Sequence, residues 1–163
     1  MRKIVASAVL VLSSFAALAA DSPLFGTWKL KTLVHEVTAT GERNNEFGDN
    51  PHGFISYAPD GRMYAIGTRS DRAKPAAAPT AEESSKLFQS MFAYAGTYTL
   101  EPGKVVHHID ISWNQRWTGT NQVRFYNVEG DTLTIKSAPV KSPRDGREGQ
   151  FVLVLEKVKA AGK

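Results

Sequence analysis

The 163-residue sequence contains no cysteine. This absence excludes disulfide bonds, thiolate metal sites and cysteine nucleophiles. The sequence also lacks a concentrated basic stripe, because lysine and arginine are scattered among aspartate and glutamate, and this pattern argues against a nucleic-acid partner. No serine stands in a Gly-x-Ser-x-Gly setting, and the glycines are too dispersed for a phosphate loop. We therefore expect neither covalent catalysis nor a bound cofactor.

The first twenty residues differ from the rest of the chain. Arg2 and Lys3 precede a mostly apolar run that ends in small residues. This order predicts a secretory signal peptide over residues 1–20, cleaved near Ala19 or Ala20. We expect an exported protein, periplasmic or secreted, whose single domain occupies residues 21–163. The apolar run is too short to predict a stable membrane anchor.

Eight short segments of β-type sequence follow, and turns rich in glycine, proline and aspartate separate them. Turns such as Pro59-Asp60-Gly61 and Glu101-Pro102-Gly103 reverse the chain tightly, so they are expected to join antiparallel neighbours. Such a set of strands forms either a two-sheet sandwich or a closed barrel. The predicted strands are residues 27–37, 53–57, 62–67, 96–100, 104–112, 121–128, 132–137 and 150–157.

One helix is expected between the third and fourth of these strands. It begins at Thr80, where Thr80-Ala81-Glu82-Glu83 has the spacing of a capping box. Leu87, Phe88, Met91 and Phe92 then fall on one face. This face either makes ordinary core contacts on the outer wall of a barrel or closes an open end, and in the second case Phe88 and Phe92 would cover a cavity.

Several motifs resemble those of a known family. Gly26-Thr27-Trp28 matches the Gly-x-Trp that opens the first strand of lipocalin barrels. In their order and spacing, the motifs are similar to those of the lipocalin-like domain family over most of the chain. This resemblance implies an all-β fold, an eight-stranded antiparallel lipocalin-like β-barrel with one helix and with Trp28 as the plug of its floor. The further motifs are Phe47-Gly48-Asp49-Asn50-Pro51-x-Gly53, Tyr57-x-Pro59-Asp60-Gly61-Arg62-Met63, Phe92-Ala93-Tyr94-Ala95-Gly96-x-Tyr98, His107-His108 and Trp117-x-Gly119-x-x-Gln122-x-Arg124.

The two adjacent histidines point to opposite faces of their strand, because side chains alternate along a strand. They therefore cannot chelate one metal ion together. His107 shares a face with Ile109 and Ile111, which predicts that His107 lies inside and His108 outside. His107 is then either a hydrogen-bonded interior histidine or a neutral group that orients a ligand. No histidine spacing demands a metal site.

The strand 121–128 allows two orientations. In the ordinary one, Val123 and Phe125 face the core. In the other, Gln122, Arg124 and Tyr126 face inward and offer a cation and a phenol to a ligand oxygen. Because a buried arginine without a partner is costly, an inward Arg124 predicts a protein carboxylate or an anionic ligand group beside it.

An eight-stranded barrel is just wide enough to be filled by its own side chains or to admit one small ligand. We expect a non-catalytic protein that binds a small hydrophobic or amphipathic molecule in the barrel. The alternatives are a cofactor-independent isomerase or cyclase in which His107 moves a proton, and a filled barrel that acts through its surface. The ligand-binding candidates are His107, Arg124, Tyr126 and Gln122 as polar groups, and Tyr57, Tyr98, Trp117 and Phe92 as walls.

Overall fold

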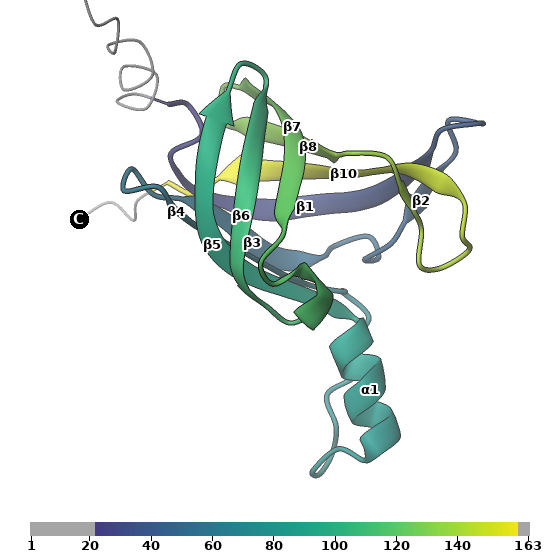
Figure 1. The fold of residues 1–163 in the computed structure, drawn as a ribbon. Coiled ribbons are helices and arrows are strands. Elements are labelled where there is room, and N and C mark those ends of the chain that lie inside the picture. Colours follow the sequence, from purple (N-terminus) through teal and green to yellow (C-terminus); the bar gives the residue numbers. More distant parts are fainter. Residues whose placement is uncertain (1–21, 160–163) are drawn as a thin grey trace, which may run out of the picture.

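The computed structural model describes residues 22–159 and shows a closed antiparallel β-barrel (Figure 1). Eight strands follow one another around the barrel in sequence order, and β10 pairs with β1 to close it. Two short strands, β2 and β9, flank the far ends of β1 and β10, which extend beyond the rest of the sheet. The expected signal peptide lies outside the described residues. The strands are β1 (Gly26–Val37), β2 (Arg43–Asn45), β3 (His52–Tyr57), β4 (Arg62–Thr68), β5 (Met91–Glu101), β6 (Lys104–Ser112), β7 (Asn121–Glu129), β8 (Thr132–Ser137), β9 (Val140–Lys141) and β10 (Glu148–Lys157).

The eight-stranded barrel predicted from the sequence is confirmed, and so are its tight turns. Gly61 and Gly103, in two of these turns, adopt positive φ angles of 84° and 71°, which favour glycine. The main difference in strand bounds concerns β5, which begins at Met91 rather than Gly96. Phe92 is therefore a strand residue, and its expected place on the helix face is wrong.

The helix α1 (Ala81–Gln89) lies between β4 and β5, the third and fourth strands of the barrel, as predicted. Its capping box is present: the Thr80 hydroxyl accepts from the Glu83 amide, and the Glu83 carboxylate accepts from the Thr80 amide. The helix has no buried residue and projects away from the barrel (Figure 1). Phe88 is 50% exposed, so it neither packs on the wall nor covers the interior. None of the helices in the described range 22–159 is long and apolar enough to span a membrane.

Trp28 fills one end of the barrel. Its side chain is 1% exposed, and its indole N–H donates to the Leu24 carbonyl oxygen at 2.8 Å. Lys157 places its ammonium 4.3 Å from the centre of the ring.

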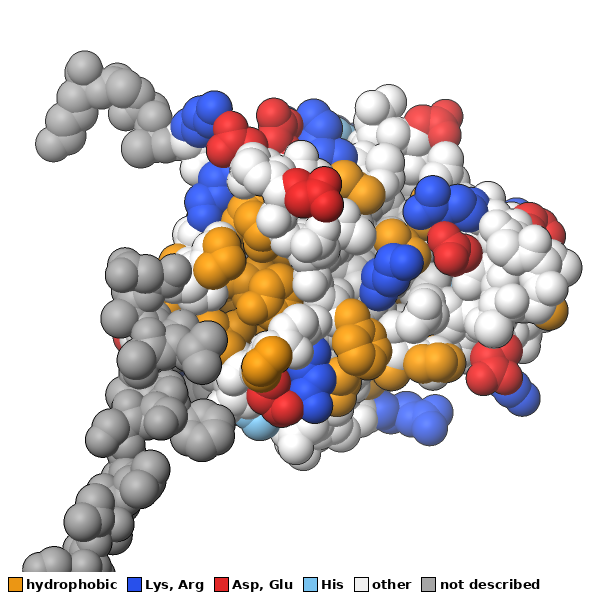
Figure 2. Space-filling view, turned by 90° about the horizontal axis from the view of Figure 1, so that it is seen from above, with side chains coloured by type: hydrophobic (Ala, Val, Ile, Leu, Met, Phe, Trp, Pro, Cys, Tyr) orange, Lys and Arg blue, Asp and Glu red, His pale blue; other side chains and the backbone are white. Residues whose placement is uncertain are grey.

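Figure 2 views the molecule from the end at which the β5–β6 turn lies, and hydrophobic side chains gather there between charged ones.

A β-bulge in β6 changes the face on which its last residues point. Ala95 pairs with Ile111 and Gly96 with Ile109, which leaves Asp110 as the extra residue. Ile109 therefore remains inside and 2% exposed, whereas Ile111 is 66% exposed. The expectation that Ile111 shares the inward face of His107 is wrong because the bulge reverses the alternation.

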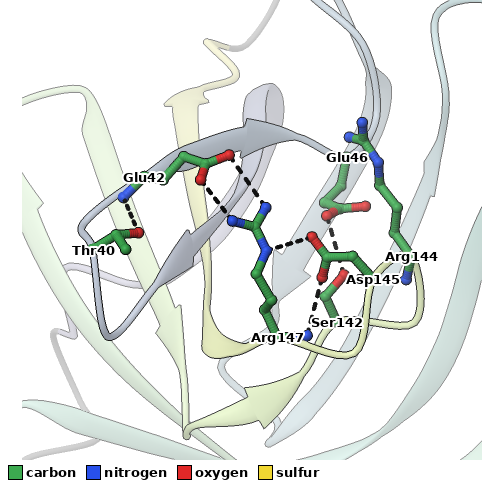
Figure 3. Close-up of polar contacts among 7 residues, drawn as sticks. All are labelled: Thr40, Glu42, Glu46, Ser142, Arg144, Asp145 and Arg147. Atoms are coloured by element: carbon green, nitrogen blue, oxygen red, sulfur yellow. Dashed lines mark hydrogen bonds and ion pairs between the residues drawn. The ribbon is translucent and has the colours of Figure 1, made fainter.

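The basic loop 141–147 is tied to the β1–β2 hairpin by ion pairs (Figure 3). The Arg147 guanidinium donates to both carboxylate oxygens of Glu42, at 2.6 and 3.2 Å, and its Nε donates to Asp145 at 2.7 Å. Nearby, the Ser142 hydroxyl lies 3.5 Å from a carboxylate oxygen of Glu46. We call Glu42, Asp145 and Arg147 the loop clasp. It holds together the two loops that extend beyond the barrel.

Candidate functional site

The interior of the barrel contains a histidine between two tyrosines. The Tyr57 hydroxyl lies 2.8 Å from Nε2 of His107, and the Tyr94 hydroxyl lies 3.2 Å from Nδ1. Tyr57 and His107 have no exposed surface, and Tyr94 is 8% exposed. Tyr57 comes from β3, Tyr94 from β5 and His107 from β6. In the sheet β5 and β6 are neighbours, and β4 lies between β3 and β5. His107 therefore faces inward, as predicted, with both ring nitrogens occupied by phenols.

Tyr98 belongs to the same aromatic group but has a different hydrogen bond. Its ring meets that of Tyr57 edge to face, with centroids 5.2 Å apart. Its hydroxyl donates to the Ala58 carbonyl oxygen at 2.7 Å. Tyr98 therefore serves as a wall, and its hydroxyl is already engaged with the backbone.

The polar face of β7 is the inward one. Arg124 pairs across the sheet with Val105 and Ser137, both of which are buried, and Tyr126 pairs with buried Ile135. Phe125 points outward and is 44% exposed. The ordinary orientation, with Val123 and Phe125 in the core, is therefore wrong. Register with the neighbouring strands decides the orientation, which alternation within β7 leaves open.

Arg124 is partly buried, and its hydrogen-bond acceptors within residues 22–159 are neutral. It donates to the Val123 carbonyl oxygen at 2.9 Å and to the Gln122 amide oxygen at 3.4 Å. Within residues 22–159, no aspartate or glutamate forms an ion pair with it. Of the two partners that an inward Arg124 predicts, the protein carboxylate is thus missing from the described part of the chain.

Burial and the Arg124 charge control the protonation of this cluster. Burial, reinforced by the Arg124 cation, holds the pKa of His107 well below its usual range, so the ring is neutral. Burial raises the pKa of Tyr57 strongly and that of Tyr94 less, and Arg124 opposes both increases. All three groups are therefore uncharged at neutral pH, and Arg124 is the cation beside them.

The remaining predicted residues lie on one side of this cluster. The Trp117 ring, in a short 3₁₀ turn (Gln115–Trp117), meets Tyr94 edge to face at 5.7 Å. Phe92 lies next to Tyr94, at 6.4 Å between ring centroids, and meets Phe47 at 5.5 Å. Trp117 and Phe92 are partly buried and pack against the core. The structure thus brings these two aromatic candidates beside Tyr94.

The inward side chains of β7 are less completely buried than those of the neighbouring strand. The inward residues of β7 are half-buried, whereas those of the adjacent β8 are buried. Two hollows of the molecule include neither Arg124 nor Tyr126, although Tyr94 contributes to the lining of the second. One of about 620 Å³ separates α1 from the loop before it, and one of about 460 Å³ lies against Tyr64, Ile66 and Trp113.

Two further kinds of site are not formed by the described residues 22–159. Asp110 forms an ion pair with Arg62 at 2.8 Å, while His108 contacts Thr99 and Asn121, so they form no acid–base pair. Among residues 22–159, no three histidine, aspartate or glutamate side chains gather as a metal site would require. His35, in β1, is also buried, but neither ring nitrogen has a protein partner in the described part.

Sequence reasoning missed Tyr94. Its signal was available, because Tyr94 and Tyr98 are four residues apart in one strand and so share a face. The Phe92-to-Tyr98 motif thus contains two inward tyrosines, of which only Tyr98 was assigned to the site.

Comparison with known proteins agrees with this architecture. No curated protein matches the chain. The model of one family, described as a lipocalin-like domain, matches residues 25–158, which include every strand of the barrel. The chain therefore belongs to the lipocalin-like domain family.

Proposed function

We propose that this is an exported protein that binds a small amphipathic molecule in its barrel and holds the anionic group of that molecule at Arg124. The observation that carries the proposal is the partly buried guanidinium with only neutral acceptors. Burying a cation without a counter-ion is costly, and a carboxylate can accept two parallel hydrogen bonds from a guanidinium. A ligand with such a group would supply the missing partner.

The surroundings of Arg124 suit the rest of such a ligand. Tyr126 and Val128 continue the inward row of β7 and keep part of their surface accessible. Trp117 and Phe92 add aromatic walls beside Tyr94. Sites for small molecules are mostly apolar with a few placed polar groups, and this interior has that composition.

The geometry supports binding better than proton transfer by His107. Both ring nitrogens are already hydrogen-bonded to tyrosines, and the ring has no exposed surface. A general base must reach the proton that it abstracts. His107 would have to act through Tyr94, so it is better placed to position that phenol than to contact a substrate.

The proposal is tested by calorimetric titration with decanoate and with its methyl ester, which share the chain but differ in charge. We expect decanoate to bind more tightly. Replacing Arg124 by Met keeps much of the side-chain length and removes the cation. It should weaken decanoate binding about 10- to 100-fold, the range for a charged hydrogen bond of about 1.5–3 kcal/mol.

Arg116→Met is the matched control, because Arg116 is an exposed arginine in the 3₁₀ turn. It should leave binding unchanged. Native mass spectrometry of the protein purified from its own host would identify a retained molecule. Equal decanoate affinity of the Arg124 and Arg116 variants, with only uncharged molecules retained, would overturn the proposed anion site.

A further inference from the structure

We propose that the Tyr94 hydroxyl donates a hydrogen bond to the bound ligand beside Arg124, so that the site selects a group with a deprotonated oxygen, such as a carboxylate or an enolate. The Tyr57 hydroxyl, in contrast, donates its hydrogen bond to His107. The ligand contact rests on the proposed function. The direction of the hydrogen bonds among Tyr57, His107 and Tyr94 rests on the protein's own geometry.

The donor and acceptor of each hydrogen bond can be assigned starting from Tyr57, because its hydroxyl has one partner within residues 22–159. That partner is Nε2 of His107, and the Tyr57 side chain has no exposed surface. If Nε2 carried a proton and donated, the Tyr57 O–H would have no acceptor within residues 22–159. A buried donor without an acceptor is destabilising. The favoured arrangement therefore has Tyr57 donating to an unprotonated Nε2.

The state of Nε2 determines the state of Nδ1. Burial keeps His107 neutral, and a neutral imidazole carries one proton. That proton must be on Nδ1, which then donates to the Tyr94 oxygen. The distances agree, since 2.8 Å is typical of an O–H donor and 3.2 Å lies within the range of an N–H donor.

Within residues 22–159, the Tyr94 O–H is left without an acceptor. Its oxygen accepts from His107, and the nearby Arg124 is a donor, so neither residue can accept a hydrogen bond from the Tyr94 hydroxyl. Tyr94 is also the phenol of the pair that retains exposed surface. The proposed ligand acceptor therefore lies against this unused donor, beside Arg124.

The two donors define the chemistry of the ligand head group. A guanidinium and a phenolic O–H both require an acceptor, and the cation favours a negative one. A carboxylate or an enolate meets both requirements. An amine head group has no acceptor once it is protonated and repels Arg124, so the site should reject it.

Nitrogen-15 NMR of the imidazoles at neutral pH tests, without any ligand, which ring nitrogen of His107 carries the proton. The His107 signals are assigned by their loss in His107→Gln. We expect a protonated Nδ1 and an unprotonated Nε2. A protonated Nε2 would overturn the inference, because Tyr94 would then be the residue that donates to His107.

The ligand contact is tested with decanoate, its methyl ester and decylamine. Tyr94→Phe should weaken decanoate binding about 5- to 20-fold and change ester binding less than 2-fold. Tyr64→Phe is the matched control, since Tyr64 is an exposed tyrosine on the outer face of β4. Decanoate binding that is equal in these two variants would overturn the contact. If neither the acid nor the ester binds, the proposed function fails. The NMR result still decides which ring nitrogen of His107 carries the proton.

Discussion

The phenol of Tyr57 and the imidazole of His107 lie 2.8 Å apart in the centre of the barrel, although 50 residues separate them in the sequence. Neither side chain has exposed surface, so this hydrogen bond has no competition from solvent. Together with Tyr94, it forms a polar chain within an otherwise apolar core. This chain makes the protein sensitive to changes at His107.

Replacing His107 by Leu should destabilise the fold by about 2–4 kcal/mol, because two buried hydroxyls lose their partner and each such loss costs about 1–3 kcal/mol. Urea denaturation measures the change. His108→Leu is the control, since that side chain faces outward and contacts only Thr99 and Asn121. Equal destabilisation by the two variants would contradict a structural role for the interior histidine.

The lowered pKa of His107 should make stability depend on pH. The unfolded chain binds a proton near its ordinary pKa of about 6.5, whereas the folded chain resists protonation until a much lower pH. Stability is therefore full above about 6.5 and decreases as pH falls toward the folded-state pKa, by up to about 1.4 kcal/mol per pH unit. Denaturation curves at several pH values measure this slope, and His107→Gln should reduce it. An unchanged slope in that variant would show that other groups cause the dependence.

The loop clasp should open in acid. Hydrogen bonds from Arg147 lower the pKa of both Glu42 and Asp145. Lowered carboxyl pKa values mean that the clasp is complete above the ordinary values near 4 and is lost as pH falls through the lowered ones. Exchange of the Arg147 Nε proton with solvent, followed by NMR, should become faster in that range.

A matched pair of variants tests whether the clasp holds the loops. Arg147→Met should speed amide exchange in residues 38–46 at neutral pH, because it removes the contacts to Glu42. Lys141→Met removes a cation from the same strand–loop segment without breaking the clasp. If both variants exchange alike, the clasp does not order the hairpin.

Gly96 should tolerate no side chain. A Cβ at this position would overlap the His108 carbonyl oxygen and approach the Asp110 amide nitrogen within 2.9 Å, where the bulge brings β6 close. Because the obstacle is backbone, Gly96→Ala should cost about 3 kcal/mol or more. The neighbouring Ala95→Gly should cost about 1 kcal/mol or less. Thermal unfolding compares them, and a similar melting temperature would contradict the close approach.

The sequence predicted the barrel because its signals are local. Short alternating segments, turns such as Glu101-Pro102-Gly103 and the capping box at Thr80 each act within a few residues. The Gly-x-Trp motif and the later motifs then favoured a barrel over a sandwich, and the family match agrees. The inward position of His107 also followed from alternation, because no bulge precedes it in β6.

The candidate site was only partly predictable because its orientation depends on distant strands. Alternation in β7 left Arg124 free to face either way, and its pairing with Val105 and Ser137 directs it inward. The β6 bulge turned Ile111 outward, and the early start of β5 moved Phe92 from the helix to the barrel.

The sequence by itself determined which segments form strands and which residue types are available to the interior. Only the tertiary structure decided that His107 lies between two tyrosines and that Arg124 has no carboxylate partner in the described chain. The physical reason is that strand formation depends on neighbours along the chain. Hydrogen-bond and charge partners in a barrel depend on register between strands, which closure of the whole sheet determines.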